Sequence, residues 1–590
     1  MIAHARRILS EILRNKFAGV VQDMRATLVN TAYSPAISEA KECAAALFTE
    51  SGSLVATDNP LYLCALAETA ARVLDDFQFE LTAEDIVVTN DPYSGGTRVQ
   101  DFTVVAPLGH EDEIVSYLAV RARMADVGGE VLGGCNPRAT EVWAEGARFT
   151  PVKLYRDGRL QKDVLATIAL NSRTPEAFKL DLEAMLGALN VGRQRLAELV
   201  RRYGAGDVQQ AMEWAIEYAE RRFQAEIRGW PEGAHHGTSR LTHDGHGRRE
   251  LVVRATVRCG QGRLEVDLSE SDEQSTGFVN STAATAYGFA LLPILSAIDD
   301  TVPKNAGVLR RIKLITRKGT LVDAEFPSPT GWSPHHVGAE VAGAVASALE
   351  KILPTRAGSV SANMPLVQTI ERAVRHGGTI EQVEVRGYDI FCRGGCSGTE
   401  GCDGWGMPGT FAASPLPSVE MYEAQFRGGI ERMELVIDSG GPGCWRGGLG
   451  TETMIRFPDD RCDLFLSVCV EPAAADADGF VGGRPGSSTE VRVLTGGQRH
   501  LIRDTLIDER IAPGTEVCLR MGGGPGWGPA WERDPRLVLA DVLDGCVSVE
   551  AAARDYGVVI DGARAAVDVE ATRKARALPP SGHERAAGRS

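Results

Sequence analysis

Glycine is the residue that most constrains how this chain can fold. It supplies 65 of the 590 residues, about 11%, against a usual share of roughly 7%. Much of it falls in runs, such as Gly440-Gly441, Gly447-Gly448, Gly482-Gly483 and Gly522-Gly523-Gly524. Glycine has no side chain, so such runs mark tight turns or places where the backbone approaches another group closely. We therefore expect a glycine-rich β-region near the C-terminus.

Hydrophobic periodicity divides the rest of the chain into helical and strand-rich parts. Residues 5–30 form a predicted amphipathic helix, because apolar residues recur there at three- and four-residue steps. That stripe consists of Leu13, Phe17, Val20, Met24 and Leu28. Short strands broken by turns are predicted over 44–160, helices over 175–228, strands again over 236–330, and a buried helix over 337–352.

The fold predicted from these patterns is a multi-domain α+β architecture with mixed β-sheets flanked by helices, since 590 residues exceed what one core supports. The expected parts are an N-terminal α+β domain with the candidate site (1–170), a helical segment (171–235), a second α+β domain (236–360), the glycine-rich β domain (361–535), a C-terminal helical segment (536–577) and a disordered tail (578–590).

Charge and hydropathy exclude several classes of protein. The net charge of −16 argues against nucleic acid or an anionic membrane surface as a partner. The sequence contains no run of about 18 apolar residues, and Arg6, Arg7 and Arg14 interrupt the N-terminal helix. We expect a cytoplasmic protein without a signal peptide or a spanning segment.

The cysteines and two short motifs are interpreted as structural. Twelve cysteines in 590 residues do not indicate a disulfide framework, and the spacing of Cys392, Cys396 and Cys402 fits no common zinc pattern. Asp438-Ser439-Gly440-Gly441-Pro442 looks like a serine-protease segment but lacks matching histidine and aspartate partners. A phosphate-binding P-loop is missing from the sequence, and prolines disrupt the glycine triplet at 524–528, so a turn cluster is expected there.

Two predicted strand ends carry an acidic residue together with a glycine pair. Asn90-Asp91-Pro92 is followed by Gly95-Gly96 and Asp101, and Asp126 is followed by Gly128-Gly129. Turns that place acids and glycines after strands are typical of binding and catalytic sites. Two ordinary surface turns would give the same pattern, so the residues alone leave both interpretations open.

Segments distributed along the chain carry a resemblance to a known family. They are Thr31–Pro35 with Ile37 and Glu39, Asn90–Asp101, Asp126–Gly129, Glu145–Ala147, Asn171–Arg173, Asp181 with Tyr203-Gly204, Asp267–Ser269 with Gly277 and Asn280, Asp438–Gly443, Arg446–Gly450, Gly482–Gly486, Arg533–Pro535 and Tyr556–Val558. Taken in order, these segments resemble the hydantoinase B/oxoprolinase family, which includes large subunits of acetone and acetophenone carboxylases.

The resemblance implies a function within a complex. A partner subunit resembling hydantoinase A is expected to bind ATP and to phosphorylate the carbonyl or amide oxygen of the substrate. The hydantoinase-B-like subunit would then open a cyclic amide of the hydantoin or 5-oxoproline type. Alternatives are a subunit of an ATP-dependent ketone carboxylase with a metal-free site, and a non-catalytic scaffold. A higher hetero-oligomer is expected.

This chain departs from the family at the positions that bind a divalent metal. In the family the ligands are an acid in the first segment, a histidine that closes the Gly-Gly-Thr-His turn, and a histidine and an aspartate before the Val-Gly-Gly turn. Here these positions hold Glu42, Arg98, Arg123-Met124 and Asp126. Arginine stays protonated and cannot ligate a metal. We expect no metal in this chain, and we expect Arg98 and Arg123 to pair with Glu42, Asp101 or Asp126.

The predicted site follows from these motifs and from the resemblance. The candidate catalytic residues are Asp91, Asp101, Asp126 and Glu42, and the candidate substrate- or anion-binding residues are Arg98, Arg123, Gly95, Gly96, Gly128, Gly129 and His336. His335 and His336 precede a predicted helix, where a neutral imidazole is favoured and a structural role is the alternative. Glu420 and Glu423 are open between a salt bridge and acid–base chemistry.

Overall fold

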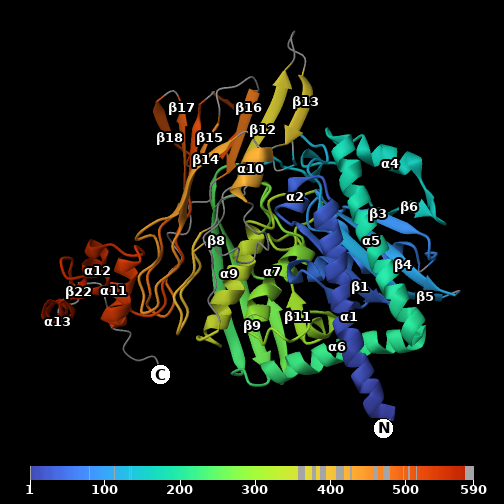
Figure 1. Ribbon diagram of the computed structural model, residues 1–590, viewed down its shortest axis with the longest axis horizontal. Helices are drawn as coiled ribbons and strands as arrows, with labels where there is room; N and C mark the ends of the chain where they lie inside the picture. The colour runs from blue at the N-terminus through green and yellow to red at the C-terminus, as the bar shows by residue number, and fades with distance from the viewer. Residues whose placement is uncertain are drawn as a thin grey trace.

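The computed structural model describes residues 2–78, 80–111, 113–131, 133–134, 136–356, 366–374, 380–385, 394–406, 418–425, 428–457, 463–469, 479–495, 497–502, 505–512 and 514–577. Cys392 and the tail predicted over 578–590 lie outside these residues. Helices and several sheets combine as predicted for an α+β fold (Figure 1).

A seven-stranded sheet forms the N-terminal part, in the order β2-β1-β5-β4-β3-β6-β7. Its strands are β1 (Cys43–Thr49), β2 (Leu54–Thr57), β3 (Ile86–Thr89), β4 (Asp101–His110), β5 (Glu113–Arg123), β6 (Val152–Arg156) and β7 (Arg159–Leu160). Every residue of β1 is buried, because its odd residues contact one core and its even residues another. The sheet is therefore covered on both faces.

Three long helices cover one face of this sheet, namely α1 (Ile2–Thr31), α5 (Pro175–Tyr203) and α6 (Ala205–Ile227) (Figure 1). The predicted stripe of α1 is confirmed, since Leu13, Met24 and Leu28 are completely buried. Short elements that border the sheet are α2 (Pro35–Ser38), η1 (Pro60–Tyr62), η2 (Pro92–Ser94), η3 (Val142–Ala144) and α4 (Lys162–Ala169).

A second sheet, of four strands in the order β11-β10-β9-β8, shares a hydrophobic core with the other face of the seven-stranded sheet. Its strands are β8 (Gly233–His243), β9 (Arg248–Gly260), β10 (Arg263–Asp267) and β11 (Ile312–Ile315), and the helices with it are α7 (Ala283–Ser296), α8 (Ala306–Leu309) and α9 (Val337–Glu350). The alternation predicted around Leu251 and Leu264 is confirmed, because both residues are buried in the core between the sheets.

The strand-rich interpretation was wrong for two helices of this shared core. Residues Leu63–Asp76 form α3, and Ala283–Ser296 form α7. Helix α7 is apolar on almost all sides because it is enclosed by α3, α9 and η1, so it shows no helical period in the sequence. The Thr282 side chain caps its first turn.

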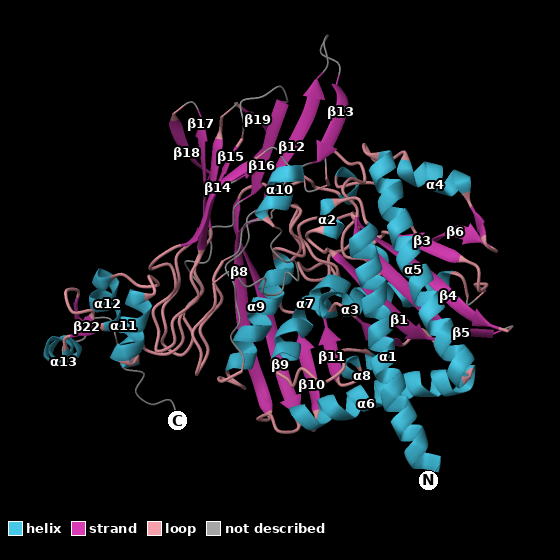
Figure 2. Ribbon diagram, viewed as in Figure 1, coloured by secondary structure: helices cyan, strands magenta, loops and turns pink. Residues whose placement is uncertain are grey.

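Two further sheets stand above the body in Figure 2, in the orders β13-β12-β16-β19 and β14-β15-β20-β17-β18. Their strands are β12 (Leu366–Val374), β13 (Ile380–Val385), β14 (Gly429–Leu435), β15 (Thr451–Arg456), β16 (Asp463–Cys469), β17 (Glu490–Thr495), β18 (Gln498–Ile502), β19 (Thr505–Ile511) and β20 (Glu516–Arg520), with α10 (Val419–Gln425) beside them. The remaining elements are η4 (Ala530–Glu532), α11 (Pro535–Leu543), α12 (Val549–Tyr556), β21 (Ile560–Asp561), β22 (Ala566–Val567) and α13 (Val569–Ala577).

The glycine runs form extended segments that pack backbone against backbone. Gly524 N donates to Gly448 O at 2.9 Å, and Gly441 N donates to Gly524 O at 2.8 Å. A Cβ on Gly524 would lie 1.9 Å from Cys396 O, and one on Gly447 would lie 1.9 Å from Gly524 O. The structure thus explains the composition by close backbone approach, where the sequence predicted a turn cluster at 524–528.

Among the helices that the structure describes, none is long and apolar enough to cross a membrane.

Candidate active site

The predicted site lies on one face of the seven-stranded sheet, where β1 and β4 begin and β5 ends. Asp101 pairs in register with Arg123, and Thr103 with Arg121, so Asp101, Arg121 and Arg123 point toward the same face by the two-residue alternation of strands. Glu42 immediately precedes β1, and its carbonyl accepts a hydrogen bond from Arg123 N at 3.1 Å. This face contacts α3 and η1.

Five charged side chains form a connected cluster there, which we call the guanidinium network: Glu42, Arg98, Asp101, Arg121 and Arg123. Arg98 donates from Nη2 to Glu42 Oε2 at 2.6 Å and from Nε to Asp101 Oδ2 at 3.1 Å. Arg123 Nη1 lies 3.2 Å from both oxygens of Glu42, and Arg121 Nη2 lies 2.8 Å from Asp101 Oδ2. No side chain of the five is more than 7% exposed.

The charges of the network favour the ionised form of Asp101. Burial alone would raise the pKa of this carboxyl, but Arg98 and Arg121 outweigh burial and lower it to about 2. Thr97 donates a hydrogen bond to Asp101, and the Arg121 guanidinium lies 4.9 Å from the centre of the Tyr62 ring. With three guanidinium groups against two carboxylates, the network carries one excess positive charge.

The residues at these positions do not fit a divalent metal. Arginine offers no lone pair, and the Arg98 guanidinium occupies the space between Glu42 and Asp101 that a shared cation would need. Across the described residues, no group of three or more His, Cys, Asp or Glu side chains is arranged to hold a metal ion.

Asp91 and Asp126 lie outside the guanidinium network. Asp91 caps η2, where it accepts hydrogen bonds from Tyr93 N at 3.0 Å and Ser94 Oγ at 2.8 Å. Asp126 accepts from Arg173 N at 2.6 Å and from Gly133 N at 3.1 Å. Of the three acids predicted to pair with Arg98 and Arg123, the structure therefore joins Glu42 and Asp101 to these arginines, whereas Asp126 binds Arg173.

The two predicted glycine pairs pack against protein backbone. A Cβ on Gly95 would lie 2.6 Å from Thr69 N, and one on Gly96 would lie 2.5 Å from Asp91 O. A Cβ on Gly128 would lie 2.6 Å from Asn171 O, and one on Gly129 would lie 2.7 Å from Ala144 O. Close packing of the turns is sufficient reason for glycine at these four positions.

Glu145 was not predicted as a site residue, although its carboxyl binds the backbone of a loop that is far away in the sequence. Its carboxyl accepts from Thr330 N at 2.9 Å and from Gly331 N at 2.7 Å, in the loop before α9. Burial raises the pKa of Glu145 to about 8, against the effect of these two donors and of the Arg98 charge. The sequence held one signal, the segment Glu145–Ala147, which is among those that resemble the family.

His336 lies at the N-terminus of α9, as predicted, and is buried. Burial and the nearby His243 lower the pKa of His336 to about 3, so the imidazole is neutral at physiological pH. The ring centre of His336 lies 5.7 Å from that of Trp332, and that of His335 lies 4.3 Å from it.

The remaining candidates lie in the glycine-rich part and within α10. Glu420 accepts from Ser418 Oγ at 2.7 Å, and Glu423 accepts from Ile430 N at 2.9 Å. The hydroxyl of Ser439 accepts from Gly450 N at 2.8 Å, as expected of a structural serine. Cys396 accepts from Trp405 N at 3.1 Å.

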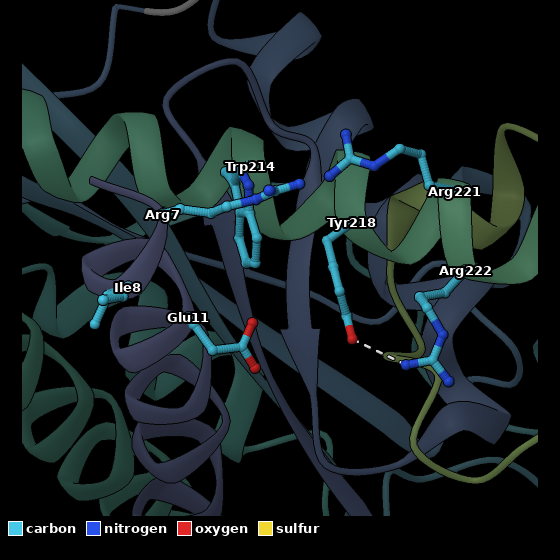
Figure 3. Close-up of a pocket in the computed structure, with 7 residues that line it drawn as sticks. All are labelled: Arg7, Ile8, Glu11, Trp214, Tyr218, Arg221 and Arg222. Carbon is cyan, nitrogen blue, oxygen red and sulfur yellow. Dashed lines mark hydrogen bonds between the residues drawn. The ribbon is translucent and has the colours of Figure 1, made fainter. Parts of the chain in front are cut away.

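A pocket of about 420 Å³ lies between α1 and α6 (Figure 3). The rings of Trp214 and Tyr218 stack there with their centres 5.1 Å apart, and Arg222 donates to Tyr218 Oη at 2.9 Å. Its other lining residues are Arg7, Ile8, Glu11 and Arg221. It shares no residue with the guanidinium network, so the predicted chemistry does not lie in this pocket.

Comparison with known proteins agrees with this fold. Residues 6–530 match the hydantoinase B/oxoprolinase family. The caprolactamase beta chain of Pseudomonas jessenii is 30% identical over 582 residues, which cover 96% of this chain and 98% of that protein. The corresponding large component of a putative D-/L-hydantoinase from Pseudomonas sp. (strain NS671) is 27% identical over 594 residues, covering 96% and 98%. The crystal structure of the ATP-dependent caprolactamase of Pseudomonas jessenii superposes with a TM-score of 0.88 at 28% identity, over 97% of this chain and 99% of that one. The chain therefore belongs to the hydantoinase B/oxoprolinase family, as its motifs predicted, and is an enzyme subunit of that family.

Proposed function

We propose that the chain is the ring-opening subunit of an ATP-dependent cyclic-amide hydrolase, and that its guanidinium network acts without a metal. The observation that carries this proposal is the pair of arginines, Arg98 and Arg123, that converge on Glu42 in a buried site. Similarity over nearly the full length to the caprolactamase beta chain and to a hydantoinase component supports a lactam or hydantoin as the substrate class.

The reaction that fits this proposal needs a subunit that holds ATP. A hydantoinase-A-like partner would transfer a phosphoryl group to the amide oxygen, which makes the amide carbon electrophilic. Water then adds to that carbon, the ring carbon–nitrogen bond breaks, and the nitrogen leaves as an amine with a proton. A second water hydrolyses the remaining acyl phosphate to a carboxylate and inorganic phosphate.

The excess positive charge of the network suits the anionic intermediates of this reaction. Both the phosphorylated amide and the acyl phosphate carry negative charge, and fixed guanidinium groups in a water-poor site stabilise such charge at little reorganisation cost. Arginine also presents a planar fork that matches phosphate and carboxylate oxygens. We assign Arg98, Arg121 and Arg123 to this role, with Glu42 and Asp101 holding the guanidinium groups in position.

Co-expression with the A-like subunit tests the proposal. The purified complex is incubated with ATP and, in turn, ε-caprolactam, hydantoin and 5-oxoproline, and the ring-opened acid is measured. We expect product from at least one cyclic amide, in a fixed ratio to ADP. Product only from a ketone with bicarbonate, or ADP without any product, would contradict it.

A further inference from the structure

Gln100 directly precedes Asp101 of the guanidinium network in the sequence, and its side-chain amide is not hydrogen-bonded to any described residue. It follows Arg98 and Val99, and its carbonyl accepts from Met124 N at 2.9 Å. The residue is completely buried, and neither Oε1 nor Nε2 has a hydrogen-bond partner among the described residues. Burying an unpaired amide costs free energy, so such a group calls for a binding partner.

The surroundings of this amide consist of backbone and further polar atoms. A Cβ on Gly134 would lie 2.0 Å from Gln100 Nε2 and 2.8 Å from Glu145 O. A Cβ on Gly331 would lie 2.7 Å from Glu145 Oε1 and 3.4 Å from Gly134 O. Thr330 Oγ1 is likewise buried without a partner among the described residues. Gly134 thus packs against the Gln100 amide and the Glu145 backbone, and Gly331 packs against the Glu145 carboxyl.

We propose that Gln100 recognises the cyclic amide group of the substrate. In a lactam or an imide the N–H and the C=O lie on the same edge of the ring, because the amide bond is cis. A side-chain carboxamide presents a donor and an acceptor on one edge in the same way. In the substrate before its phosphorylation, the ring N–H would donate to Gln100 Oε1 and the ring carbonyl would accept from Nε2, which leaves the hydroxyl of Thr330 to bind a neighbouring polar atom.

This pairing makes Gln100 a specificity-determining residue and favours cyclic amides over ketones. A ketone has no N–H and would leave Oε1 unpaired, and a site built for a hydrogen bond rejects an analogue that lacks it. The inference rests on the proposed function for the identity of the substrate class.

Access to Gln100 would require movement of the backbone at Gly128–Gly129 and Gly133–Gly134. The amide is closed to solvent in this conformation, and Gly128, Gly129, Gly133 and Gly134 all have positive φ values. Backbone of this kind adopts alternative conformations at low steric cost.

Direct binding to the purified complex tests the inference separately from turnover. Titration calorimetry is performed with ε-caprolactam, hydantoin and 5-oxoproline and with the N-methyl counterpart of each. We expect wild type to bind at least one N–H compound about tenfold or more tightly than its N-methyl counterpart, as for the loss of one buried hydrogen bond. In Gln100→Leu, which replaces the amide with a shorter apolar side chain, this ratio should fall to about one.

A thermal melt of the ligand-free variants shows whether Gln100 is structural. Since its amide is unpaired among the described residues, Gln100→Leu should melt at the wild-type temperature or above it. The inference is overturned if wild type shows no preference for any N–H compound, if Gln100→Leu keeps the preference, or if this variant melts several degrees lower. Binding with the expected preference but without ATP-dependent product would instead count against the proposed function alone.

Discussion

The guanidinium of Arg98 bridges two carboxylates at the starts of different strands, with Nη2 at 2.6 Å from Glu42 Oε2 and Nε at 3.1 Å from Asp101 Oδ2. All three side chains are buried. A permanent cation therefore sits at the point where β1 and β4 begin, and removal of either carboxylate would leave charge uncompensated in a low-dielectric environment.

Replacing Asp101 should destabilise the protein strongly. In Asp101→Asn, Arg98 and Arg121 lose their shared counter-ion, and we expect the free energy of unfolding to fall by about 3–5 kcal/mol. Because the pKa of Asp101 is lowered from its ordinary 3.8 to about 2, its contribution is present above pH 3.8 and is lost as the pH falls through 2. Urea denaturation at pH 7 measures the loss.

The matched control for Asp101 is Asp91→Asn, which alters a partly exposed cap of a short 3₁₀ helix. It should cost about 1 kcal/mol or less. Equal losses in the two variants would show that the network does not depend on Asp101.

Glu145 should give the protein a pH-dependent stability. The fold raises the pKa of this carboxyl from its ordinary 4.5 to about 8, so the stability that it contributes is fully present below pH 4.5 and is lost as the pH rises through 8. In Glu145→Gln this loss should disappear. Melting temperatures from pH 5 to pH 9 should therefore fall more steeply for wild type than for the variant.

Glu176→Gln provides a control on the surface, since the Glu176 side chain is 81% exposed and its removal should leave the slope unchanged. The slope is compared rather than the absolute melting temperature, because the amide of the variant cannot accept from both Thr330 N and Gly331 N. If the melting temperatures of wild type and Glu145→Gln changed with pH in parallel, this would contradict the raised pKa of Glu145.

Exchange of both arginines for histidine should create metal binding. Arg98→His/Arg123→His places two imidazoles next to Glu42 and Asp101, a donor set that zinc and manganese accept. We expect the double variant to take up zinc on dialysis, as measured by elemental analysis. Arg98→Lys/Arg123→Lys keeps the charge without adding ligands and should take up none. Zinc uptake equal to wild type in the histidine variant would show that these positions do not surround a common centre.

Glycines of the extended segments should tolerate no side chain. Gly524→Ala would place a Cβ 1.9 Å from Cys396 O, a backbone atom that cannot move aside, so we expect loss of soluble protein or a melting temperature lower by many degrees. Gly187→Ala, within α5 and with no atom near its Cβ, should instead stabilise by about 0.5–1 kcal/mol. The melting temperatures of the two variants, compared with wild type, show whether Gly524 is needed for close packing or for flexibility.

The sequence predicted those features that a local pattern or a family motif encodes. The stripe of α1 is one example, because it packs along a single face with a period of 3.6 residues. The pairing of Arg98 and Arg123 with an acid is another, because two cations replaced ligands that converge on one point. The same reasoning included Asp126, which the chain instead uses to hold Arg173.

Contacts between distant segments could not be predicted in this way. Arg121 lies within a buried strand among apolar residues, and only its register opposite Thr103 shows that it shares a face with Asp101. Glu145 acquires its hydrogen-bond donors from a loop 185 residues away in the sequence. Helix α7 could not be predicted, because burial on every side removes the periodicity on which helix prediction depends.

Metal content and ATP-dependent ring opening, measured on one preparation of the complex with its A-like partner, test the central claim most directly. The claim is that guanidinium groups stand in place of a metal in an active subunit. We predict ring-opened product from a preparation whose zinc, manganese and iron are far below one equivalent per chain, with activity unchanged when a chelator that leaves the magnesium of ATP in place is added. One equivalent of a transition metal bound to this chain, with activity lost on its removal, would contradict the account.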